Sequence, residues 1–275
     1  MSQEKSQADI LKEELFFEKK HFSNQMSDEE LSKADKFCEG YKDFLAKGKT
    51  ERECVDYMAE AAEKNGFVPY DNKKAYKAGD KVYLNNRGKS IILAVMGTKG
   101  VSEGAKIVAA HIDAPRLDLK PTPLYETDEL AYFKTHYYGG IKKYQWVAIP
   151  LSLHGVVIDK DGNSIKVNIG EDPADPKFVI TDLLPHLDKE QSKRPLLEGI
   201  KGEELNILIG SRPFKSDSGS NLVKLNVLKI LNEIGAYMLA RFFYCHFCHI
   251  CVDHNLDKFL KGSLLRIPAK FLTCL

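Results

Sequence analysis

The sequence predicts an α/β protein whose N-terminal third is helical and whose later part is rich in strands. Apolar residues recur at helical spacing in the first third, and short apolar or β-branched runs separated by turn residues follow. One run, residues 105–115, becomes apolar at Ile107 and contains His111 and Asp113. Such a run is typical of a buried strand, and α/β sheets place their chemistry at the carboxyl ends of their strands.

Two helices are predicted from their starting signals. Ser27 and Glu30 fit a capping box, and so do Thr50 and Glu53. The apolar residues expected to face a core are Leu31, Ala34, Phe37, Cys38, Tyr41, Phe44 and Leu45 in the first helix, and Val55, Met58, Ala61 and Ala62 in the second. The Asn-Gly pair at 65–66 is expected to end the second helix.

Three strands are predicted next, at residues 81–84, 90–95 and 106–110, with turns between them. Helices followed by strands, the last of them leading to His111, suggest the start of an α/β catalytic domain.

A β-rich unit is predicted from about residue 121. Pro121 and Pro123 are expected to interrupt the chain, and residues 159–162 form a hairpin-type turn. The expected strands are residues 147–158, 164–169, 177–181 and 205–209. The predicted division is a catalytic part at 1–120, a β-rich domain at 121–225, and a return segment with a tail at 226–275.

Composition and charge argue against two classes of partner. The net charge of +1 gives no broad basic field for nucleic acid. No apolar run reaches the roughly 18 residues that a membrane-spanning helix needs, and the first residues lack the apolar core of a signal peptide. A cytoplasmic location is therefore expected. Two of the 6 Cys, Cys38 and Cys54, lie in the predicted helices and the others crowd into the tail, so no disulfide framework is predicted.

His111 and Asp113 are the candidate site. Two residues apart in an extended chain, they lie on one side, where the imidazole can bind a metal while the carboxylate orients it. A metal-activated water would suit a hydrolase. The alternative is a histidine that caps a strand and hydrogen-bonds locally, since the same spacing recurs at His186 and Asp188.

Three separated motifs carry a resemblance to a known family. They are HIDAPRLDLKP at 111–121, THYYGGIKKYQW at 135–146 and LSLHGVV at 151–157. In this order they resemble the aspartyl aminopeptidase or aminopeptidase I family of di-zinc exopeptidases, over about residues 37–233. The resemblance implies the N-terminal part of a zinc-exopeptidase α/β catalytic domain with an inserted β-rich assembly domain. It also implies two zinc ions per site, peptide substrates that lose N-terminal, probably acidic, residues, and a homo-oligomer.

The resemblance assigns roles to three residues. His111 matches a zinc ligand, and Asp113 matches the catalytic carboxylate that orients it. His186 resembles a histidine of the inserted domain that reaches a neighbouring subunit's active site and binds substrate. Its alternative is an exposed turn histidine. Glu203 and Glu204 are interpreted as a solvated surface pair, because the family's other zinc ligands lie in a C-terminal part that the chain does not match.

Other aromatic and histidine residues are expected to be structural or to mediate assembly. His136 and His154 are interpreted as structural. The loop at 135–146 offers aromatic anchors for an interface: Tyr137, Tyr138, Tyr144 and Trp146.

The tail leaves three interpretations open. Cys245, Cys248 and Cys251, with nearby Asp253 and His254, are spaced for a metal site, but no distant Cys pair completes it. The others are a helix with buried thiols and an altered or out-of-register C-terminus. Three functions follow: an aminopeptidase that is catalytically incomplete in this chain, an inactive fragment that serves as an assembly or binding module, and a Cys/His metal-binding protein.

Overall fold

The computed structural model describes residues 6–17, 19, 21–158, 162–215 and 218–233 in full, and the backbone of residues 248–252. The chain divides into two compact units, residues 1–45 and residues 46–275, which are described separately.

The first unit is helical. It contains α1 (Gln7–Leu15), a short 3-10 helix (Phe22–Gln25) and most of α2 (Asp28–Lys47). The Ser27–Glu30 capping box is confirmed, because each residue's side chain bonds the other's backbone N–H. The core packing expected for residues 31–45 is wrong, since no residue of α2 is buried and Phe37 is 59% exposed. An apolar stripe is buried only if another surface covers it.

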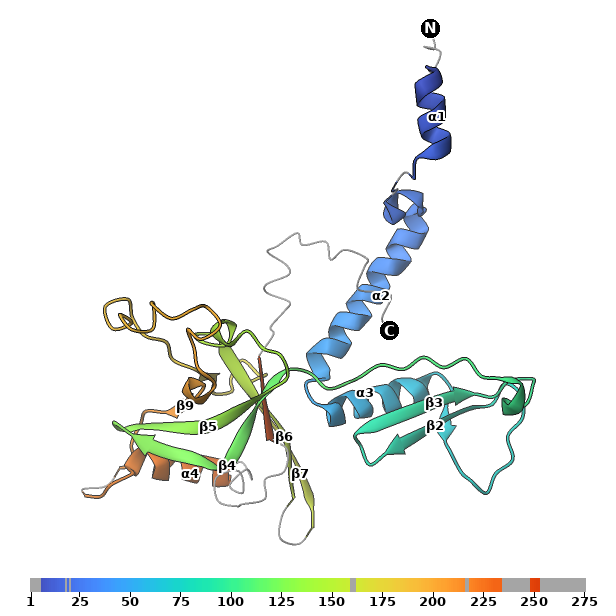
Figure 1. The fold of residues 1–275 in the computed structure, drawn as a ribbon. Coiled ribbons are helices and arrows are strands. Elements are labelled where there is room, and N and C mark those ends of the chain that lie inside the picture. The colour runs from blue at the N-terminus through green and yellow to red at the C-terminus, as the bar shows by residue number, and fades with distance from the viewer. Residues whose placement is uncertain are drawn as a thin grey trace. The chain divides into compact units, whose positions relative to one another are not determined.

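The second unit begins with a helix on a small sheet (Figure 1). Helix α3 (Glu51–Lys64) starts with the predicted capping box and packs against β2 (Lys81–Asn86) and β3 (Ser90–Val95). Strand β1 (Val68–Pro69) pairs in parallel with β2, and β2 pairs with β3 in an antiparallel hairpin. Residues buried here include Cys54, Val55, Ala62 and Val82.

The prediction of a buried strand at residues 106–110 is wrong. These residues form no helix or strand, and Ile107 and Val108 are 85% and 81% exposed. A strand forms only when a neighbour pairs with its backbone. The small sheet consists of β1, β2 and β3 alone in the described part of the chain.

The rest of the second unit is a large closed sheet. It is built from β4 (Arg116–Thr127), β5 (Leu130–Tyr138), β6 (Pro150–Ile158), β7 (Ser164–Ile169), β8 (Phe178–Val179), β9 (Ile207–Gly210) and β10 (Cys248–Val252). Its order is β10-β4-β5-β9-β8-β6-β7, and β10 also pairs with β6. Because β10 pairs with both β4 and β6, the strands close into a ring.

The β4–β5 hairpin replaces two predicted irregular segments. The interruption expected at Pro121 and Pro123 affects the pairing but does not end the strand: β4 runs through both, with a register shift between Leu119 and Leu124. Thr122 there has a positive φ of 49°. Proline is tolerated in a sheet at such irregularities, where a ladder hydrogen bond is already missing. The 135–146 loop likewise begins as strand, because β5 continues to Tyr138.

The core of this unit lies inside the closed sheet and under α4 (Leu222–Glu233). Trp146, expected as an interface anchor, is instead buried in this core at 8% exposure. Helix α4 lies so close to β9 that a Cβ on Gly210 would fall 2.6 Å from a methyl group of Val227. Glycine is therefore required for this helix–sheet contact.

The tail is described only in part. Residues 248–252 form a strand, which contradicts the helix that was one of the three interpretations. Cys245, Asp253 and His254 lie outside the described residues, so the metal-site interpretation stays untested. No helix in the described part of the chain is long and apolar enough to cross a membrane.

Candidate functional site

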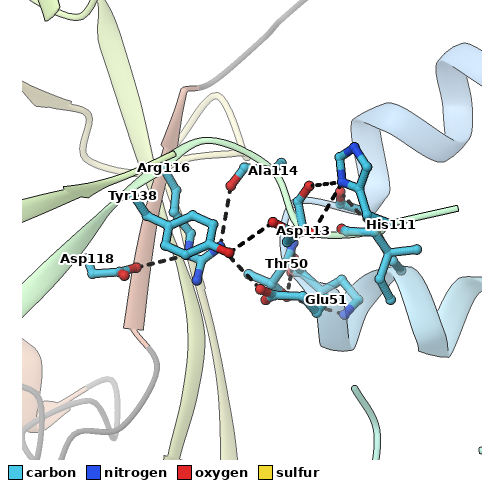
Figure 2. Close-up of polar contacts among 12 residues, drawn as sticks. Thr50, Glu51, His111, Asp113, Ala114, Arg116, Asp118 and Tyr138 are labelled. Carbon is cyan, nitrogen blue, oxygen red and sulfur yellow. Dashed lines mark hydrogen bonds and ion pairs between the residues drawn. The ribbon is translucent and has the colours of Figure 1, made fainter. Parts of the chain in front are cut away.

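His111 and Asp113 lie in the extended segment that enters β4, where they contact each other (Figure 2). The His111 Nδ1 atom is 3.0 Å from the Asp113 carbonyl oxygen and 3.2 Å from its Oδ1. Because both oxygens only accept from the imidazole, Nδ1 must carry the proton in the neutral ring. Nε2 then has a free lone pair, and the side chain is 82% exposed. A metal-binding histidine is commonly oriented in this way by a carboxylate or carbonyl on its other nitrogen.

The second Asp113 oxygen is held by the closed sheet. The Tyr138 hydroxyl, from β5, donates to Asp113 Oδ2 at 2.9 Å. This hydrogen bond lowers the pKa of Asp113 and outweighs the opposing effect of burial. The same bond raises the pKa of Tyr138. Asp113 is therefore stabilised as a carboxylate.

Arg116 forms a platform under Tyr138. It is buried, and its guanidinium carbon lies 3.9 Å from the centre of the Tyr138 ring. Its nitrogen atoms contact Asp118 Oδ1 at 2.9 Å, Glu51 Oε1 at 3.2 Å and the Ala114 carbonyl at 3.3 Å. The Arg116 cation thus links three parts of the chain: the first turn of α3 through Glu51, the segment before β4 through Ala114, and β5 through Tyr138.

A second cluster surrounds His154, which is 2% exposed in β6. Its Nδ1 lies 2.8 Å from Glu53 Oε1, and its Nε2 lies 2.9 Å from Glu171 Oε1. Burial by itself lowers the pKa of His154, but the hydrogen bonds to Glu171 and Glu53 outweigh it and raise the pKa to about 8. Glu171 also accepts from Ser152 at 3.0 Å and lies 3.9 Å from the buried Lys49 Nζ. This confirms the structural interpretation of His154.

Gly170 gives Glu171 its place in that cluster. Its φ is +113°, and an added Cβ would lie 2.9 Å from the Ser152 Cα. Only glycine combines this conformation with so close an approach of two backbones.

The chain matches a family model along most of its length. Residues 44–250 match the aminopeptidase I zinc metalloprotease (M18) family. The chain belongs to the M18 aminopeptidase family. The resemblance noted from the three motifs is therefore confirmed, as is the α/β fold class with a β-rich part.

Individual M18 proteins are similar to this chain in sequence and in structure. The chain is 47% identical over 224 residues to a probable M18 family aminopeptidase 1 from Clostridium acetobutylicum, covering 80% of this chain and 48% of that protein. The crystal structure of an M18 aminopeptidase from Thermotoga maritima superposes with a TM-score of 0.78 at 41% identity, over 86% of this chain and 51% of that one. The structure of the S. cerevisiae mApe1 dodecamer shares the fold, with a TM-score of 0.54 at 18% identity over 79% of this chain and 48% of that one. The chain spans about half the length of the relatives that it matches.

The M18 family name implies zinc, which needs a set of suitable side chains. Zinc in proteins takes four ligands, of which at least three are usually protein side chains. Within the described ranges, no three His, Cys, Asp or Glu side chains gather in a way that would hold a metal ion. His111 offers one imidazole with an oriented ring, so the described residues do not form a zinc site by themselves.

The third predicted residue, His186, lies apart from this cluster in its contacts. It is exposed in a turn closed by a hydrogen bond from Leu187 to Leu184. No contact among the described residues joins it to His111 or Asp113. A cavity of about 260 Å³, bounded in part by Asp182, Arg194 and Glu204, lies beside the same loop, and none of the three predicted site residues lines it.

The residues that hold the site together are not evident from the sequence. Local patterns give Arg116 no role and predict Tyr138 as an interface anchor. They predict Glu53 as a helix cap, yet its second oxygen binds His154. The one signal in the sequence for a role of Arg116 is its positive charge close to the candidate metal-binding motif of His111 and Asp113. The surface interpretation of Glu203 and Glu204 is confirmed, since they pair with Lys120 at 2.6 Å and Arg194 at 3.0 Å near the surface.

Proposed function

We propose that this protein is a zinc-dependent aminopeptidase that removes N-terminal acidic residues from peptides. Membership of the M18 family supports the reaction class. The observation that carries the proposal is the His111–Asp113 pair, in which Nδ1 is held at 3.0 and 3.2 Å and Nε2 is left open. The preference for acidic residues rests on the resemblance of the three motifs alone.

Three residues have roles in this proposal. His111 binds zinc through Nε2, and Asp113 orients it as a catalytic carboxylate. His186 contacts substrate in the active site of a neighbouring copy, which its exposed turn permits. The assembly unit is the β-rich domain of about residues 121–225, between a catalytic part at 1–120 and a final segment at 226–275. The cytoplasmic location stays a prediction.

The 275 residues alone are proposed to be catalytically incomplete. The described residues supply one oriented imidazole and no set of three potential metal ligands. Asp113 can hold the ring of His111, but the residue that activates water and the remaining ligands must come from outside the described residues.

A second candidate function is an assembly or binding module without catalysis. The contrast in packing between the two parts favours it. The closed sheet and α4 have a continuous buried core, whereas the segment leading to His111 is exposed. The part resembling an assembly domain is thus well packed although the segment before His111 is not.

Zinc stoichiometry and turnover test these functions together. We expect the purified chain to hydrolyse Asp- or Glu-amide substrates slowly or not at all. Turnover that a chelator abolishes and zinc restores would contradict the proposed incompleteness. Zinc lost in His111→Ala but kept in His136→Ala supports the aminopeptidase, zinc absent from the wild-type chain supports the module, and one zinc lost on mutation of Cys245 or Cys251 supports a metal site in the tail.

A further inference from the structure

The closed sheet contributes one side chain to the His111–Asp113 pair, and that side chain is Tyr138. Its hydroxyl holds Asp113 Oδ2 at 2.9 Å, while Oδ1 of the same carboxylate lies 3.2 Å from Nδ1 of His111. Each oxygen of the carboxylate therefore has its own partner, Tyr138 on one side and the His111 imidazole on the other (Figure 2).

Tyr138 is itself held in place from below. The buried Arg116 guanidinium lies 3.9 Å from the ring centre, where a cation–π contact is favourable. Arg116 cannot easily shift, because Asp118 and Glu51 contact it at 2.9 and 3.2 Å. A rigid donor of this kind restricts the directions that the Asp113 carboxylate can take.

We infer that Tyr138 is a positioning residue, which fixes the Asp113 carboxylate and so selects the His111 tautomer with Nδ1 protonated and Nε2 open. The inference deepens the proposed function, since it rests on the roles proposed for His111 and Asp113. It also means that a residue of the β-rich part helps to set the tautomer of the candidate zinc-binding histidine. The Asp113 carbonyl, at 3.0 Å from Nδ1, favours the same tautomer, so Tyr138 contributes part of the preference.

The tautomer of His111 is the quantity to measure. NMR of metal-free, ¹⁵N-histidine-labelled protein at about pH 8.5, where an ordinary imidazole is neutral, distinguishes protonated from bare ring nitrogens. The His111 signals are identified by their loss in His111→Gln. Tyr138→Phe removes the hydroxyl and keeps the ring on Arg116. Tyr137→Phe is the matched control, because the Tyr137 ring contacts His136 and Lys143 instead.

We expect Tyr138→Phe to lower the ratio of the Nδ1–H to the Nε2–H tautomer of His111 by about two- to fivefold, which is within the effect of one hydrogen bond. Tyr137→Phe should leave the ratio unchanged. An unchanged ratio in Tyr138→Phe would overturn the inference.

A second comparison tests the route through Asp113. In an Asp113→Ala background, adding Tyr138→Phe should not alter the His111 ratio further. A further change would show that Tyr138 acts by another route and would overturn the inference. Zinc binding is measured separately: zinc that His111→Ala retains rejects the proposed role of His111, and it leaves the positioning role of Tyr138, which the tautomer ratio tests, intact.

Discussion

At the scale of single residues, the imidazole of His154 links helix α3 to the closed sheet. Both ring nitrogens face carboxylates, of Glu53 at 2.8 Å and of Glu171 at 2.9 Å, so only the doubly protonated ring satisfies both. Its backbone neighbours across the sheet are Asn168 in β7 and His249 in β10. Buried charges are stabilised by such pairing and become costly when one partner is removed.

His154 predicts a pH dependence of stability. Its pKa is about 8 in the folded chain, against about 6.5 for an ordinary histidine. A raised pKa stabilises the fold when the group is protonated. The contribution, about 2 kcal/mol, should be complete below about pH 6.5 and lost as the pH rises through 8. His154→Gln should therefore lower the free energy of unfolding in urea more at pH 6 than at pH 9, both roughly outside the interval between the two pKa values.

The exposed His186 supplies the control for that experiment. His186→Gln should leave the unfolding free energy nearly unchanged at both pH values, because surface substitutions usually have small effects. An equal loss for His154→Gln at both pH values would show that the ring contributes only packing.

At the scale of secondary-structure elements, α2 and α3 both start with a capping box, but α2 is exposed and α3 is partly buried. In both, a hydroxyl residue and a glutamate three positions later cap each other's backbone. Around α3 the glutamate has a second task, because Glu53 Oε1 binds His154. Helix α3 also buries Cys54, Val55 and Ala62, whereas α2 buries none of its residues.

These two capping boxes predict different mutational effects. Thr50→Ala should lower the free energy of unfolding by about 1–2 kcal/mol, the upper range for a lost N-cap, since Glu53 loses its anchor as well. Ser27→Ala should change it by less than about 0.5 kcal/mol, as an exposed helix contributes little to global unfolding. Fluorescence of the sole tryptophan, Trp146, which is buried in the second unit, is the measurement. Equal effects of the two variants would show that α3 is not coupled to the closed sheet.

At the scale of the whole molecule, exposed apolar side chains predict self-association. One group lies before His111 and includes Ile107 and Val108, at 85% and 81% exposure. The other lies in the loop around His186 and consists of Leu183, Leu184, Leu187, Leu196 and Leu197, each more than half exposed. Apolar surface of this kind favours contact with another protein surface.

The two groups predict different association behaviour in light scattering at about 10–50 µM, where weak interfaces are populated. Assembly through the β-rich part should give one defined species, which a Leu184→Ser/Leu187→Ser variant converts to monomer. Association through the exposed segment should give a concentration-dependent mixture, which Ile107→Ser/Val108→Ser reduces. A monodisperse wild-type monomer would contradict both.

What the sequence determined about this protein is local. The two capping boxes, the hairpin of β2 and β3, and strand β7 at residues 164–169 all depend on neighbours a few positions away. Short-range hydrogen bonds and turn residues act regardless of the rest of the fold. The three motifs were enough to indicate the M18 family, because a motif is a set of residues at fixed positions in the sequence.

Only the tertiary structure decided what pairs with what. It carried β4 through Pro121 and Pro123, buried Trp146, and left residues 106–110 without a strand partner. It also brought Tyr138 to Asp113, 25 positions earlier, and Glu53 to His154, 101 positions later. Strand pairing and buried ion pairs depend on residues far apart in the sequence, so local patterns name the candidate histidine but not the side chains that hold it.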